Sequence, residues 1–115
     1  MVSLPWPPSV NRVWRSYRGR TVLASEVRTY RKAVWAEVLL QGIPRHMLNK
    51  RLEVSILANA PDERARDLDN LLKAPLDALK HCGVILDDSL IDLLRIERGE
   101  VSKRPRLTIQ ISERQ

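Results

Sequence analysis

Four β-strands are predicted, three of them from alternating apolar and polar positions. The stretches VSLPW (residues 2–6), LEVSILA (residues 52–58) and RLTIQIS (residues 106–112) alternate in this way, and a further strand is predicted near residues 92–99. A period of two places the apolar side chains on one face of a strand. Because Pro5 has no backbone N–H, we expect the first strand to lie at an edge of the sheet or to end at this residue.

Apolar residues at helical spacing predict a helix over residues 25–40. Ser25 is a suitable N-cap, and Gly42 is typical of a residue that follows a helix. The expected buried stripe joins residues three and four positions apart, namely Val27, Tyr30, Val34 and Val38, and is widened by Trp35 and Leu39.

A second helix is predicted over residues 68–82, with Gly83 as its stop. Its expected buried stripe consists of Leu68, Leu72, Leu76 and Leu79. Pro75 conflicts with a regular helix, so we expect a kink near Leu71–Pro75. The order β-α-β-α-β-β predicts an α+β fold in which two helices pack on a small mixed sheet.

Length and composition predict one domain over residues 1–115. Apolar residues make up 43% of the chain and charged residues 30%, which is typical of a folded protein. The chain has no apolar run long enough to span a bilayer and no evident secretory signal. The single Cys82 excludes an internal disulfide. We therefore expect a cytoplasmic protein with no membrane partner; the resemblance described below implies a bacterial or phage-encoded one.

The positive charge is concentrated in the first half of the chain. The net charge is +6, yet residues 1–51 contain ten lysines and arginines against two glutamates. This imbalance favours a polyanionic partner, most simply nucleic acid, although a solvated basic surface remains an alternative. The expected phosphate contacts of this segment are Arg12, Arg15, Arg18 and Arg20, with Trp14 among them as a possible stacking residue.

Carboxylates nevertheless gather in the stretch RARDLDNLLKAPLDAL, residues 64–79, and again at Asp87 and Asp88. Aspartates at a helix start are ordinary caps, and this alternative stays open for Asp67 and Asp69. Taken together, these acids predict a Mg²⁺ site, since Mg²⁺ prefers carboxylate and phosphate oxygens. Three neighbouring cations would serve the same site: Lys73 would stabilise developing charge, while Arg64 and Arg66 would hold the DNA backbone.

The combined spacing D-x-D-N-x-x-K followed by D-D resembles the RusA-type Holliday-junction resolvases, as does the opening LPWPPSVNRVWRSYRGRT. The resemblance implies a homodimeric endodeoxyribonuclease that nicks two opposed strands of a four-way DNA junction in recombination and repair. It implies Mg²⁺, with Mn²⁺ as a substitute, bound by Asp67, Asp69 and Asp88, and Lys73 as the essential lysine. Asn70 and Asp87 would support the site.

Two alternatives remain open. One is a non-catalytic nucleic-acid-binding module whose acids are only caps, and the other is a nuclease of the same fold that acts on other branched DNA. The nuclease prediction itself requires Asp67, Asp69 and Asp88 to meet in one hollow beside Lys73. Carboxylates lying on separate surfaces would contradict it.

Overall fold

The computed structural model describes residues 1–8, 20–44 and 50–114, with side chains in the second range described from Ser25 onward. It confirms the α+β class. The elements follow one another as β1 (Val2–Pro5), α2 (Arg20–Leu40), β2 (Leu52–Asn59), the 3₁₀ turn η1 (Leu68–Leu71), α3 (Lys73–His81), the 3₁₀ turn η2 (Asp88–Leu90), β3 (Ile91–Arg98) and β4 (Arg106–Glu113).

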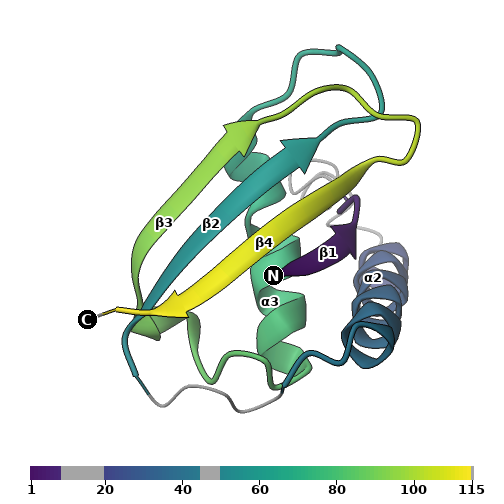
Figure 1. The fold of residues 1–115 in the computed structure, drawn as a ribbon. Helices are drawn as coiled ribbons and strands as arrows, with labels where there is room; N and C mark the ends of the chain where they lie inside the picture. The colour runs from purple at the N-terminus through teal and green to yellow at the C-terminus, as the bar shows by residue number, and fades with distance from the viewer. Residues whose placement is uncertain (9–19, 45–49, 115) are drawn as a thin grey trace.

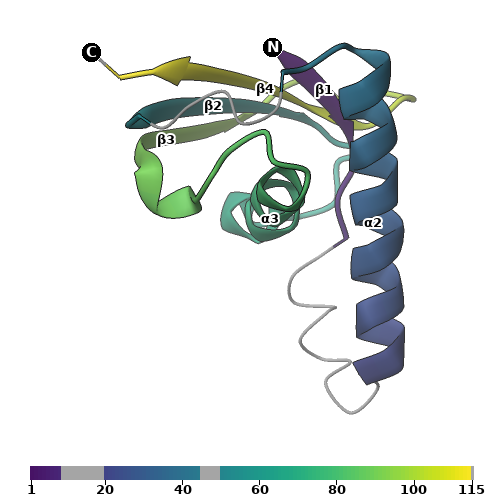
Figure 2. The same ribbon diagram turned by 90° about the horizontal axis from the view of Figure 1, so that it is seen from below.

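The four strands form one mixed sheet in the order β1-β4-β2-β3 (Figure 1). β2 and β3 run parallel, whereas β4 is antiparallel to both β1 and β2. Both helices lie on the same side of the sheet, and the other face carries no helix (Figure 2). β1 is an edge strand, which confirms the place predicted from Pro5, and β3 forms the opposite edge.

The core lies between this covered face and the helices. From α2, Tyr30, Val34 and Val38 are buried as predicted. Trp35 and Leu39 do not widen the stripe, because they lie 36% and 57% exposed on the outer side of the helix. The hydroxyl of Tyr30 donates to the carbonyl of Pro5 at 2.9 Å, which ties α2 to β1, and burial raises the pKa of this phenol.

α2 extends further toward the N-terminus than predicted. It begins at Arg20, so Ser25 lies inside the helix and is not its cap. Residues 20–24 contain neither Gly nor Pro. Going from Ser25 toward the N-terminus, the first residue that disfavours a helix is Gly19.

Both long helices end as predicted, at glycines with positive φ. Gly42 has a φ of 65° and Gly83 a φ of 79°. In α2 the N–H of Ile43 donates to the carbonyl of Val38 at 3.0 Å, and the N–H of Gly42 donates to that of Leu39 at 3.3 Å. α3 has the same arrangement beyond His81, so each helix closes with a Schellman motif.

The second predicted helix is divided in two. Instead of a kink inside one helix, η1 ends at Leu71 and α3 begins at Lys73. Pro75 is therefore in the first turn of α3, where its missing N–H removes no helical bond. The buried stripe also differs from the prediction: Leu71, Pro75, Ala78 and Leu79 are buried, whereas Leu68, Leu72 and Leu76 are only partly buried. A pattern of leucines alone misses the buried proline and alanine.

Candidate functional site

Asp67 and Asp69 lie where the chain arrives from β2 and begins η1. Asp67 precedes η1 with extended backbone (φ −84°, ψ 130°), as the sequence predicts for an N-cap. Its side chain, however, makes no capping hydrogen bond. Asp69 lies in the first turn of η1, and both side chains are exposed. Capping therefore does not explain the Asp67 carboxylate, which is left available for another role.

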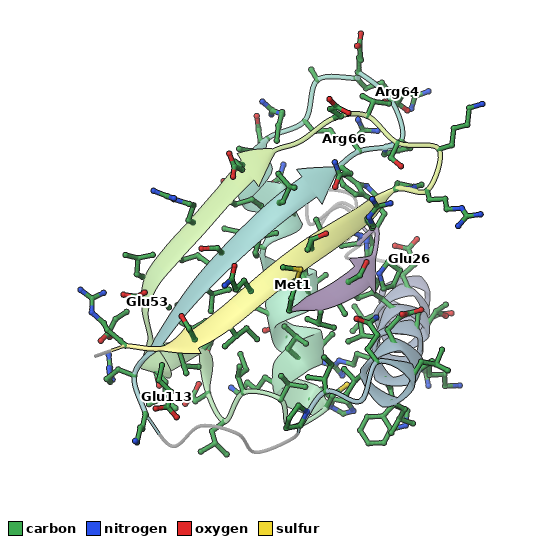
Figure 3. The ribbon with its side chains drawn as sticks, viewed as in Figure 1. Met1, Glu26, Glu53, Arg64, Arg66 and Glu113 are labelled. Atoms are coloured by element: carbon green, nitrogen blue, oxygen red, sulfur yellow. The ribbon has the colours of Figure 1, made fainter. Side chains whose placement is uncertain are left out.

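Arg66 fixes the segment that leads into Asp67. Its Nη1 donates to the carbonyl of Asp62 at 3.0 Å and lies 2.9 Å from the Asp62 carboxylate. Its guanidinium also lies 5.7 Å from the centre of the Trp6 ring, a cation–π contact with β1's end. The hydrogen bond from Arg66 is the main reason that the pKa of Asp62 lies below its usual value. Figure 3 shows Arg66 and Arg64 in the loop at this end of the sheet.

Arg98, the last residue of β3, holds the same segment from the other side. Its guanidinium donates to the carbonyl of Arg66, one peptide before Asp67. Sequence reasoning missed this residue, because no motif connects an arginine at the end of a strand with a carboxylate some thirty positions earlier. By contrast, the Arg64 side chain is 84% exposed and lies 3.9 Å from Asp62, so it projects into solvent beside the site.

Two hollows meet at Asp67. One, of about 690 Å³, lies between Trp6, Leu68 and the Arg98 end of β3. The other, of about 420 Å³, is lined by Trp6, Asp67 and Asn70 among others. The N–H of Asn70 donates to the carbonyl of Asp67 at 3.2 Å. Asn70 thus contacts Asp67 through its backbone and lines the same hollow, and its supporting role stays a prediction.

Lys73 is the first residue of α3 and is paired with Asp77. Its Nζ lies 3.5 Å from the Asp77 carboxylate, and its side chain is 58% exposed. The sequence predicts that Lys73 shares a helix face with Asp69, but Asp69 belongs to the separate turn η1. An exposed ion pair of this kind contributes only about 0–1 kcal/mol, so the ammonium can leave Asp77 at little cost.

Asp87 and Asp88 lie at η2. Asp87 caps this turn by accepting a hydrogen bond from the N–H of Ser89 at 3.3 Å. The pKa of Asp87 is lowered to about 2, first by a hydrogen bond with the Asp88 carboxyl and then by Ser89 and Lys80. The Nζ of Lys80 lies 3.4 Å from Asp87 and 3.9 Å from Asp88. Asp87 thus has a structural task, which agrees with its predicted supporting rank.

One chain does not bring the two groups of aspartates together. Asp67 and Asp69 lie near the end of β3, where Arg98 contacts Arg66, whereas Asp88 precedes the start of β3 (Figure 1). Eight residues of strand extend over roughly 25 Å. Accordingly, the described residues contain no group of three or more His, Cys, Asp or Glu side chains that could hold one metal ion. The expected common hollow is not formed within a single chain.

Part of the predicted DNA-binding set lies outside the described residues. This applies to Arg12, Trp14, Arg15 and Arg18, and for Arg20 only the backbone, which begins α2, is described. Among the described helices none is long and apolar enough to cross a membrane.

Comparison with known proteins supplies the family. Residues 5–112 match the family model described as "Endodeoxyribonuclease RusA". The chain belongs to the RusA family. It is 40% identical over 112 residues to the crossover junction endodeoxyribonuclease RusA of Escherichia coli strain K12 and equally to that of Enterobacteria phage 82. Both alignments cover 97% of this chain and 92% of the relative.

The relative from Enterobacteria phage HK97 is 38% identical over 111 residues, with 96% of this chain and 91% of the relative covered. The resemblance seen in the D-x-D-N-x-x-K and D-D spacing is thereby confirmed, and so is the enzyme class: this RusA-family chain is an endodeoxyribonuclease.

Proposed function

We propose that this chain cuts crossover junctions, the four-way branched intermediates of DNA recombination and repair, by paired nicks in two opposed strands. Its RusA relatives carry crossover junction cleavage in their names and come from bacteria and phages, which favours action on DNA in the bacterial cytoplasm. The observation that carries the proposal is the pair of exposed carboxylates at Asp67 and Asp69, of which Asp67 makes no capping bond and follows a segment held by Arg66 and Arg98.

We further propose that the activity requires Mg²⁺, for which Mn²⁺ can substitute. Carboxylates are the donors that suit a hard divalent cation, and the predicted ligands Asp67, Asp69 and Asp88 are all exposed. A bound Mg²⁺ would supply an activated water and neutralise charge on the scissile phosphate. The donor type therefore fits the ion, whereas the distribution of the donors over one chain does not.

A homodimer removes this conflict. β3 is an edge strand within the described sheet, and its Leu93 and Leu94 are each 41% exposed. An unpaired strand edge is a ready template for a strand of a second chain. In a two-fold antiparallel pairing, Ile91 would lie opposite Arg98 of the partner subunit. Because η2 precedes Ile91 and Asp67 lies beside Arg98, this pairing carries the Asp88 carboxylate of each chain toward Asp67 and Asp69 of the other.

The remaining residues have roles that follow from their places. Lys73 begins α3 four residues after Asp69, and its exposed ammonium can move from Asp77 to stabilise charge developing on the phosphate. Arg64 projects into solvent and is suited to a phosphate oxygen. Asn70 and Asp87 support the acids next to them. Arg12, Arg15, Arg18, Arg20 and Arg66 remain proposed DNA contacts.

The test is a substrate panel of four-way, three-way, flap and linear duplex DNA at one salt concentration, with Mg²⁺ or Ca²⁺. We expect symmetric nicks in the four-way junction with Mg²⁺ only. Asp69→Asn should abolish cutting and leave junction binding intact or tighter, since it removes a negative charge. Glu37→Gln on α2, whose carboxylate accepts a hydrogen bond from the Gln41 amide, is the matched control and should cut normally.

Other outcomes of the panel separate the alternatives. Preferred cutting of flaps or three-way junctions would replace the proposed substrate by another branched DNA. Junction binding without any cutting in Mg²⁺ or Mn²⁺ would leave a binding module and would contradict the proposed activity.

A further inference from the structure

A basic cleft lies between α2 and the C-terminal end of α3, away from Asp67. Its volume is about 740 Å³, and its walls are Arg28, Arg31, Lys32 and Trp35 of α2 together with residues 81–83. His81, in the last turn of α3, is exposed at the mouth of this cleft. The cleft-lining residues include no carboxylate.

The cations of α2 share one side of the helix. At 3.6 residues per turn, Arg28, Arg31 and Lys32 fall within about 100° of one another around the axis. Trp35 lies in the middle of this arc. The two acids of α2, Glu26 and Glu37, fall on the opposite side, so the sequence of the helix separates its charges and turns the positive side to the cleft.

Two side chains in the cleft have properties that suit a ligand. The Nε of Arg31 is buried and has no hydrogen-bond acceptor among the described residues. A buried donor without an acceptor is unfavourable, and a phosphate oxygen would supply the missing acceptor. Trp35 is 36% exposed although it is large and apolar, and an indole at the edge of a cationic cleft can pack on a sugar or a base.

A purely structural explanation accounts for only part of this charge. The C-terminal end of a helix carries a partial negative charge that favours nearby cations. The last turn of α3 already contains Lys80 and His81 for that purpose, and its terminal carbonyls accept backbone N–H groups from Cys82, Gly83 and Val84. Three additional cations on α2 exceed what the end of one short helix requires.

We propose that this cleft binds the phosphate backbone of one arm of the DNA substrate, a contact that rests on the proposed junction-cutting function. His81, which lines the cleft, follows Lys80 in α3, and Lys80 contacts Asp87 and Asp88. The cations Arg28, Arg31 and Lys32 follow one side of α2. This arrangement favours an extended chain of phosphates over a single small anion.

The test compares the double variant Arg28→Ala/Lys32→Ala with the control Lys50→Ala/Arg114→Ala. Each removes two positive charges, and the control residues pair with Glu113 and Glu53, away from the cleft. The dissociation constant for a four-way junction is measured in Ca²⁺ over a range of salt. The logarithm of the association constant falls linearly with the logarithm of the salt concentration. Each lost phosphate contact should reduce the steepness of this fall by about 0.9 and weaken binding about 5-fold at 0.15 M salt.

In the proposed homodimer the cleft variant loses four contacts, two in each chain, so we expect it to lose about 3.6 units of slope and to bind about 900-fold more weakly, whereas the control should stay close to wild type. Lys32→Ala alone, at an exposed position, should lose about 1.8 units and bind about 30-fold more weakly, and it covers the case in which the double variant does not fold. Wild-type slope and affinity in Lys32→Ala would overturn the proposed cleft. A wild-type chain that fails to bind junctions would instead contradict the proposed function itself.

Discussion

Mixing two inactive variants, Asp67→Asn and Asp88→Asn, should restore cutting. The expectation follows from distance. Asp67 lies beside the end of β3, and Asp88 lies before its start. The eight residues of β3 extend over roughly 25 Å. Carboxylate oxygens bind Mg²⁺ at about 2.1 Å, so two ligands of one ion lie within about 4 Å of each other. No rotation of an aspartate side chain covers the difference, so the proposed metal site requires ligands from two chains.

The size of the effect follows from counting sites. After full exchange, half of the dimers carry one chain of each variant. In such a dimer one site contains both lesions, while the other combines intact Asp67 and Asp69 with an intact Asp88 of the partner subunit. Half of the dimers are mixed, and each mixed dimer has one intact site out of two. The mixture therefore regains a quarter of the wild-type number of intact sites.

The assay uses a supercoiled plasmid with an extruded four-way junction. Paired nicks linearise it, whereas a single nick leaves an open circle. The mixture should therefore produce open circles, and either variant alone should produce none. Asp67→Asn mixed with Asp69→Asn is the control, because both lesions fall in the same part of the site and no intact site can form. Absence of recovery, with exchange verified by two differently tagged chains, would refute the two-chain arrangement.

Three further predictions concern stability, each measured by urea unfolding. The pKa of the Asp87 carboxyl is lowered to about 2, so its stabilising effect is present above about pH 4 and is lost as the pH falls through 2. Asp87→Asn should therefore be less stable than wild type at neutral pH and equal to it near pH 2. Tyr30→Phe keeps the buried ring and removes only the hydroxyl that donates to Pro5, so it should lower the free energy of unfolding by about 1–2 kcal/mol. An unchanged unfolding midpoint would contradict the role of that bond. Gly83→Ala forces a side chain into φ 79° and should cost about 1–2 kcal/mol, whereas Ala36→Ser on the exposed side of α2 should cost less than half of that.

The strands could be predicted well because the polarity of each residue in the sequence corresponds to its burial in the sheet. In β2 and β4 the residues that alternate in polarity also alternate in burial, since one face of the sheet is covered and the other is open. The helix boundaries were less accessible. α2 extends five residues beyond Ser25 because a serine permits a cap without requiring one, and the break before α3 depends on where Pro75 fits best.

The local conformation of the site was also predictable, but its partners were not. The extended backbone of Asp67 follows from a polar connection that runs into a helix. Arg98 holds the Asp67 segment through a contact between distant parts of the chain, and Lys80 joins Asp87 and Asp88 across a tight turn. Contacts of this kind depend on strand pairing, which neither periodicity nor residue spacing specifies.

The separation of the aspartates has a topological cause. β2, α3 and β3 form a parallel βαβ unit, in which the chain leaves the first strand at one end of the sheet and must return to the other end before it enters the second. Asp67 follows the first strand and Asp88 precedes the second, so the fold itself holds them apart. Acids divided in this way can share one ion only if a second copy reverses the direction of β3. A two-fold axis across the β3 edge does this, because it places the start of one strand beside the end of the other. The same sequence signature that indicates a metal site, set on this topology, therefore also predicts that cleavage requires two chains.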